Sequence, residues 1–276
     1  MTAEPELVTL EVEDGVAVLT WNQPERHNAW NIPLEERYYD RLHRAETDPE
    51  IRVIVVTGAG RSFCPGMDSS SLSDQVATGI STNPHLRRPM TTPTTIAKPI
   101  IAAINGACAG IGLVAAVNCD LRFVSATAKL TTAFANRGIM AEHGLAWALP
   151  RLIGTSRALD LLYSGRVVLG DEAVAIGLAD RVFAPEELLP KTLEYAKSLA
   201  ANSSPVAMGT IKRQVYASWG STLEESRVMA LRFWMGHVRH HPDFKEGVRS
   251  YLEKRSPHFD SWDPDFPAEP DPLPRS

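Results

Sequence analysis

PIIAAINGACAGIGLVAAV, residues 99–117, is the stretch that decides the fold. Its first half is a continuous apolar run, too short for a helix and typical of a buried strand. Glycines follow at 106, 110 and 112, and the apolar segment after them predicts a buried helix. A glycine turn between strand and helix leaves backbone N–H groups free to stabilise negative charge. The turn alone is equally compatible with a tight connection that has no chemistry. Its G-x-x-x-G-x-G spacing differs from the dinucleotide-binding and phosphate-loop motifs.

The chain before this stretch predicts strands and a helix in alternation. Residues 7–21 alternate between apolar and polar side chains around Asp14-Gly15, which is a strong hairpin signal. A helix is expected from about residue 33 to residue 46. Residues 51–57 form a nearly continuous β-branched run, typical of a parallel strand covered on both faces. This order favours an α/β fold with right-handed crossovers.

The chain after this stretch changes character near residue 185, where the pattern becomes helical only. We therefore expect a core over residues 1–200 and a helical C-terminal region with an extended tail over residues 201–276. Residues 69–95 are rich in serine, threonine and proline and predict a long loop that shapes a pocket. Helices are predicted over residues 186–200, 206–218, 222–238 and 242–254.

Composition restricts the classes of function. The 276 residues carry a net charge of −5, which provides no general attraction for nucleic acid or anionic membranes. No run reaches the ~18 apolar residues of a membrane helix, and no signal peptide is visible, so a cytoplasmic location is expected. Cys64, Cys108 and Cys119 have no C-x-x-C spacing and are expected to be reduced and buried. His237, His240 and His241 have no suitably spaced acidic or cysteine partner, so no metal site is expected.

Several blocks, in this order along the chain, resemble the crotonase superfamily, also called the enoyl-CoA hydratase/isomerase family. The resemblance implies a spiral of ββα turns with a helical C-terminal region, assembled as a trimer or a hexamer. It also implies acyl-CoA thioester substrates, with coenzyme A carried by the substrate and no separate cofactor. The matching blocks are residues 22–29, 55–68, 98–120, 149–154, 164–166 and 251–255.

The resemblance implies that two backbone N–H groups stabilise the enolate of the thioester. By motif match these belong to Met67 and Ile111, the latter between Gly110 and Gly112. This agrees with the free donors expected from the glycine turn itself. Gly66 would turn the backbone before residue 67.

Other positions of the resemblance concern the binding of coenzyme A. Cys64 and Asp68 flank the first N–H group, and Asp68 either fixes this loop or is a simple turn residue. Arg26 is expected near the phosphates, with a solvated turn residue as the alternative. Tyr251 and Lys254 resemble positions that close over the nucleotide, in the same subunit or a neighbouring one.

The acid and base positions distinguish the reactions within this family. The two glutamates of its hydratases correspond here to Val114 and Phe134, which cannot activate water. Glu142 matches the single catalytic glutamate of the peroxisomal-type Δ3,Δ2-enoyl-CoA isomerases. One carboxylate can remove a proton at C2 and return it at C4, in an apolar pocket expected to include Trp147. His143 is a second, weaker acid–base candidate.

Three alternatives remain open from the sequence. Glu142 could be a helix N-terminal carboxylate held by the helix dipole. The protein could be a 2-enoyl-CoA hydratase that activates water through Glu142 and His143. It could also be a catalytically degenerate protein that binds acyl-CoA.

Overall fold

The computed structural model describes residues 6–68, 73 and 87–263, so most of the predicted 69–95 loop lies outside the described residues. The chain begins with a hairpin of β1 (Val8–Glu13) and β2 (Val16–Trp21), paired antiparallel. Asp14 and Gly15 form its turn, both with positive φ. The hairpin expected from the Asp-Gly signal is therefore confirmed.

In the described part of the chain, six strands form a large sheet in the order β1-β2-β3-β5-β7-β10. All pairs after the hairpin are parallel. Every residue of β3 and β5 is buried, which confirms the strands predicted from the two apolar runs. The further strands of this sheet are β3 (Val53–Gly58), β5 (Ile100–Ile104), β7 (Leu121–Ser125) and β10 (Arg181–Phe183).

A smaller sheet runs beside the first, in the order β4-β6-β8-β9. The chain passes alternately between the sheets, from β3 to β4, from β5 to β6 and from β7 to β8. A helix, α3 (Ile111–Val117), follows the second of these passages. Each turn thus places one strand in each sheet, as the predicted ββα spiral requires. The strands are β4 (Ser62–Cys64), β6 (Ala107–Ala109), β8 (Lys129–Thr131) and β9 (Val168–Leu169).

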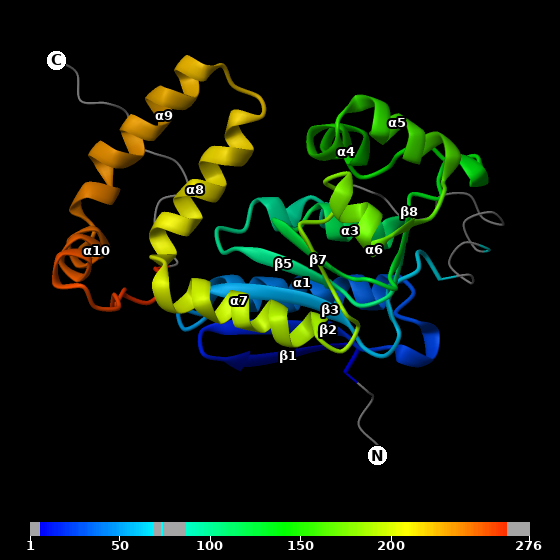
Figure 1. Ribbon diagram of the computed structural model, residues 1–276, viewed down its shortest axis with the longest axis horizontal. Helices are drawn as coiled ribbons and strands as arrows, with labels where there is room; N and C mark the ends of the chain where they lie inside the picture. The colour runs from blue at the N-terminus through cyan, green and yellow to red at the C-terminus, as the bar shows by residue number, and fades with distance from the viewer. Residues whose placement is uncertain (1–5, 69–72, 74–86, 264–276) are drawn as a thin grey trace.

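Helices cover both faces of the large sheet. The alternation of side chains along β3 sends Ile54 and Val56 into the main apolar core with α1, and Val53 and Val55 into a second core with α7. Figure 1 shows α3, α4, α5 and α6 gathered at one end of the molecule. Besides α3, these helices are α1 (Ile32–Thr47), α4 (Leu145–Ile153), α5 (Thr155–Ser164), α6 (Gly170–Ala175) and α7 (Leu188–Asn202). Short 3-10 turns lie at Pro24–Arg26, Thr92–Thr94, Ala135–Arg137 and Val238–His240.

The C-terminal helices extend away from the sheets (Figure 1). They are α8 (Pro205–Ser218), α9 (Leu223–Gly236) and α10 (Pro242–Glu253), close to the predicted ranges. A capping box of Thr222 and Glu225 starts α9. Among the described residues no helix combines the length and apolar character needed to cross a bilayer.

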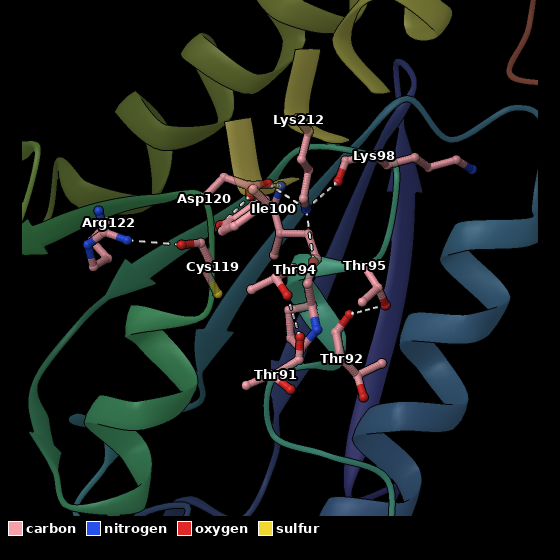
Figure 2. A network of polar contacts seen from close by, with 12 residues as sticks. Thr91, Thr92, Thr94, Thr95, Lys98, Ile100, Cys119, Asp120, Arg122 and Lys212 are labelled. Atoms are coloured by element: carbon pink, nitrogen blue, oxygen red, sulfur yellow. Dashed lines mark hydrogen bonds and ion pairs between the residues drawn. The ribbon is translucent and has the colours of Figure 1, made fainter. Parts of the chain in front are cut away.

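A buried ion pair anchors α8 to the core (Figure 2). Lys212 Nζ lies 2.7 Å from Asp120 Oδ2 and donates to the carbonyl oxygens of Pro93 and Lys98, at 2.9 and 3.1 Å. Asp120 also accepts from the Ile100 N–H, at 2.7 Å. Asp120 therefore has a structural role, because it ties α8 to the start of β5.

Replacing Lys212 with methionine should lower the free energy of unfolding by about 2–3 kcal/mol, because Asp120 would keep its partly buried charge and lose its cation. The Lys212 side chain is only 6% exposed, so water cannot take the place of the ammonium group. Urea unfolding measures the effect. Lys191→Met, which removes an exposed ion pair with Glu194, is the control and should leave stability unchanged. Equal stability of both variants would contradict the anchoring role.

Candidate active site

Two loops meet where the strands of the small sheet end. β4 and β6 run parallel, with Cys64 opposite Cys108, so the segments that leave them lie side by side. A Cβ added at Gly112 would lie 2.2 Å from the carbonyl oxygen of Cys64, and one added at Gly66 would lie 3.5 Å from that of Ala109. Only glycine at 112 permits so close an approach of α3 to the 64–67 loop.

The Met67 N–H group is oriented by a bridge to Trp30. The Trp30 N–H donates to the Gly66 carbonyl at 2.8 Å, and the Asp68 N–H donates to the Trp30 carbonyl at 2.9 Å. Because the C=O of Gly66 and the N–H of Met67 belong to one trans peptide group and point in opposite directions, the N–H of Met67 faces away from Trp30.

The Ile111 N–H group lies at the first position of α3. Gly110 precedes it with φ 52°, and the Val114 N–H donates to the Gly110 carbonyl at 3.0 Å. The first helical N–H groups have no partner within their helix. Among the described residues, no acceptor is bound by the N–H of Met67 or of Ile111. Two backbone donors without a described acceptor thus lie on two loops that are in close contact, and paired donors of this kind can hold a negatively charged oxygen when they converge.

The side chains around the first loop fix its backbone. Cys64 is completely buried, and burial raises the pKa of its thiol to about 12, so the thiol is not a nucleophile at neutral pH. Asp68 is buried and pairs with Arg26, with 3.4 Å between Oδ2 and Nη1. Arg26 is more than half exposed, and its predicted contact with a phosphate stays a prediction. All three cysteines are free and buried, as predicted.

The residues at the positions of the hydratase glutamates are apolar. Val114 and Phe134 are both buried and belong to the main apolar core, as does Ile111. Leu145 and Ala148 of α4 belong to this core too, and Ala141 packs against it. None of these side chains is a carboxylate.

Glu142 follows Ala141 directly and is half-buried. Its side chain has no hydrogen bond or ion pair with any described residue. His143 and Gly144 both have positive φ, at 53° and 80°, so a sharp turn separates Glu142 from α4. The N-cap of α4 is Gly144, without a side-chain cap. Glu142 therefore does not cap this helix. This argues against the alternative that Glu142 is only a structural carboxylate at the N-terminus of α4.

A charged cluster that the sequence did not reveal lies behind the first loop. Glu35 on α1 is buried and accepts a hydrogen bond from the Trp30 indole Nε1 at 2.8 Å. Arg87 also binds Glu35, with 2.9 Å between Nε and Oε1. In the sequence Glu35 is indistinguishable from the solvated acidic residues typical of a first helical turn, so no signal could have found it.

The pKa of His143 is lowered mainly by desolvation, and the charged groups around it make smaller contributions. Desolvation by the surrounding protein lowers the pKa of His143, the Glu142 carboxylate opposes this, Arg87 lowers the pKa further and Glu35 raises it. Glu142 and His143 therefore lie within electrostatic range of one another, and Glu35 and Arg87 lie within range of the same ring.

His143 should make the protein less stable in acid. Its lowered pKa means that the unfolded chain binds a proton more readily than the folded protein. His143 therefore costs no stability above about pH 6.5, the usual pKa of histidine, and costs stability increasingly below it. Urea unfolding across this range should show a smaller acid loss for His143→Gln than for the wild type. An unchanged pH dependence would contradict the lowered pKa.

The structure does not bring every predicted site residue together. Tyr251 and Lys254 lie at the end of α10, at the opposite end of the chain's fold from α3 (Figure 1), so they do not reach the paired N–H groups of their own chain. Trp147, expected beside Glu142, is half exposed and packs against Trp219 and Arg151. In the described ranges no group of three or more histidine, cysteine, aspartate or glutamate side chains is arranged to hold a metal ion.

Comparisons with known proteins identify the family of this chain. The sequence profile of the enoyl-CoA hydratase/isomerase family matches residues 11–262. The chain belongs to this family. The two loops that carry Met67 and Ile111 lie within the matched residues, and so do Val114, Phe134 and Glu142.

Family relatives with different activities are similar to this chain. The 1,2-epoxyphenylacetyl-CoA isomerase of Escherichia coli (strain K12) is 32% identical over 263 residues, covering 92% of this chain and 98% of the relative. The (E)-benzylidenesuccinyl-CoA hydratase of Thauera aromatica is 34% identical over 253 residues, covering 91% and 98%. Both an isomerase and a hydratase are thus similar to this chain to nearly the same degree.

Solved structures of the family share the fold. A crystal structure of an enoyl-CoA hydratase from Bacillus anthracis superposes with a TM-score of 0.84 at 28% identity, covering 92% of this chain and 99% of that one. An enoyl-CoA hydratase from Mycobacterium marinum is 46% identical, with a TM-score of 0.67 over 77% of this chain and 98% of that one. The crotonase-like α/β fold expected from the sequence is confirmed.

Proposed function

We propose that this protein isomerises enoyl-CoA thioesters, moving a double bond from C3=C4 to C2=C3, as the peroxisomal-type Δ3,Δ2-enoyl-CoA isomerases do. The observation that carries the proposal is the presence of two backbone donors without a described acceptor, at Met67 and Ile111, together with buried apolar side chains at Val114 and Phe134. Coenzyme A enters as part of the substrate, and the proposed reaction needs no other cofactor.

In the proposed reaction the thioester oxygen lies between the N–H groups of Met67 and Ile111. Glu142 removes a proton from C2, and the electron pair of that C–H bond moves onto the thioester oxygen to form a dienolate. The two N–H groups stabilise this charge, with roughly 3–4 kcal/mol from each donor. Glu142 then delivers its proton to C4, which leaves the double bond at C2=C3.

The surroundings favour isomerisation over addition of water. A hydratase must hold and activate a water molecule, but Val114 and Phe134 supply no polar atom in their side chains, and both are buried. Glu142 is half-buried and has no hydrogen-bond or ion-pair partner among the described residues, so its carboxylate is available for proton transfer.

Hydration of 2-enoyl-CoA is the second candidate function, and one observation favours it. The lowered pKa of His143, next to Glu142, favours a neutral imidazole that could accept a proton from water. Several relatives carry the name hydratase. Sequence identity does not decide between the two reactions.

An assay of the wild-type protein separates the candidates. With 3-hexenoyl-CoA, isomerisation should produce the absorbance of a conjugated thioester, and a substrate deuterated at C2 should give a product that carries deuterium at C4. With crotonyl-CoA, hydration would instead remove that absorbance. Loss of absorbance without isomerisation would establish the hydratase. Binding of acyl-CoA with neither reaction, across substrates of several chain lengths, would establish a degenerate binding protein.

We also propose a homotrimer or a hexamer, in which Tyr251 and Lys254 contact the nucleotide of a substrate held by a neighbouring subunit. Apolar side chains on the C-terminal helices support this, since Tyr251 and Leu252 are both largely exposed in the single chain. Light scattering after size-exclusion chromatography measures the assembly. A monomer with full activity would contradict this part of the proposal.

A further inference from the structure

Both carboxylate oxygens of the buried Glu35 side chain have a hydrogen-bond or ion-pair partner. Oε2 accepts from Trp30 Nε1 at 2.8 Å and also forms an ion pair with Arg87 Nη2, while Oε1 accepts from Arg87 Nε at 2.9 Å. The Glu35 side chain is only 6% exposed. Burying a charge is costly unless it is fully paired, so this geometry fixes the carboxylate, the guanidinium and the indole relative to one another.

Trp30 transmits this arrangement to the first donor of the active site. Its backbone binds the 66–68 segment on both sides of Met67, through the Gly66 carbonyl and the Asp68 N–H. Its ring is buried and packs edge-on against Trp21 and Tyr38, with centroids 5.3 and 5.9 Å apart. The hydrogen bond from the indole N–H to Glu35 is the polar contact that fixes the orientation of this ring.

We infer that Glu35, acting through Trp30 and held by Arg87, is a positioning residue for the Met67 N–H group. The inference rests on the proposed function only in requiring that this N–H bind the thioester oxygen; it is independent of isomerase or hydratase chemistry. Donors that stabilise a developing charge act only when they are held in place beforehand. A displacement of about 1 Å can cost about 100-fold in rate.

A purely stabilising ion pair would not need this geometry. Apolar side chains of similar volume often stabilise a protein as well as a buried ion pair does. Here the carboxylate instead accepts a hydrogen bond from the side chain of Trp30, and the backbone of Trp30 hydrogen-bonds to the residues on both sides of Met67. The arrangement thus connects α1 to the loop of the active site.

Two variants test the role. Trp30→Phe removes the indole donor and keeps an aromatic ring, and Glu35→Gln keeps an acceptor but removes the charge that holds Arg87. Both should lower kcat by about 10- to 100-fold, with KM changed much less, because the donor acts mainly on the enolate. Arg88→Met is the matched control, since Arg88 lies on the same segment but pairs with the exposed Asp40 at 2.7 Å. It should keep the wild-type kcat.

A pair of ligands makes the test specific. Acetoacetyl-CoA forms an enolate that can use both N–H groups, whereas a thioether analogue of butyryl-CoA has no carbonyl oxygen. The wild type and Arg88→Met should prefer acetoacetyl-CoA, and Trp30→Phe and Glu35→Gln should lose about 10-fold of that preference while binding the thioether normally. A variant that is merely less stable would show a lower Tm and a similar loss for both ligands.

The outcomes distinguish a failure of the proposed oxyanion site from a failure of the positioning role alone. If the wild type itself shows no preference for acetoacetyl-CoA, the oxyanion site is absent and the positioning role fails with it. If the wild type shows the preference and both variants keep it together with their kcat, the positioning role alone is overturned. A loss of kcat that follows only the loss of folded protein, measured by thermal unfolding, also overturns it.

Discussion

Replacing Glu142 with glutamine should lower kcat by about 100- to 10,000-fold, the range expected for the loss of a general acid–base group. Glutamine has nearly the same shape as glutamate but cannot take up the C2 proton. Because Glu142 has no hydrogen bond or ion pair with a described residue, the change should leave the fold intact. Initial rates with 3-hexenoyl-CoA measure the effect. KM should change little.

Glu36→Gln is the matched control, since Glu36 on α1 is exposed and lies outside the site. It should keep the wild-type rate. If Glu142→Gln kept full activity, Glu142 would not be the base, and His143→Gln would then test the neighbouring imidazole. If both variants were fully active, no acid–base role would remain for the 142–143 turn.

Gly112→Ala should damage both stability and catalysis. The added Cβ would lie 2.2 Å from the carbonyl oxygen of Cys64 and 2.8 Å from its Cβ, so the backbone of one loop must move. We expect a loss of about 1–3 kcal/mol in the free energy of unfolding, as for other overpacked sites. We also expect kcat to fall by about 100- to 1,000-fold, the cost of losing one donor to the enolate.

The control for this variant is Gly220→Ala, because a Cβ at Gly220 would meet no atom within 4 Å. It should leave kcat unchanged and leave stability equal or slightly higher. Urea unfolding and initial rates measure both effects in the same samples. Wild-type activity of Gly112→Ala would show that the distance between the 64–67 loop and α3 does not matter to the reaction.

Local signals predicted the main elements. The Asp14-Gly15 hairpin and the apolar run of β5 are where the sequence places them, and the predicted helices agree within a few residues. Such signals act over a few neighbouring residues, so they are readable without the fold. They did not reveal the short strand β6, which lies inside the predicted glycine turn.

The site was only partly predictable. The glycine turn at 106–112 indicated free N–H groups at the start of α3, and the motif match named Met67 as their counterpart. Nothing local indicated that Glu35 would bind Trp30 and Arg87, because Arg87 lies 52 residues further along the chain. The same holds for the anchoring of α8 by Asp120, because its partner Lys212 lies far along the chain.

The sequence by itself determined the order of strands and helices, the glycine turn, and the absence of carboxylates at Val114 and Phe134. Tertiary structure alone decided that the ends of β4 and β6 lie side by side, that the Met67 N–H faces away from Trp30, and that Glu35 is buried. The physical reason is the range of the interactions. Propensity and turn chemistry act within a few residues, whereas parallel strand pairing and the burial of charge depend on contacts between distant segments.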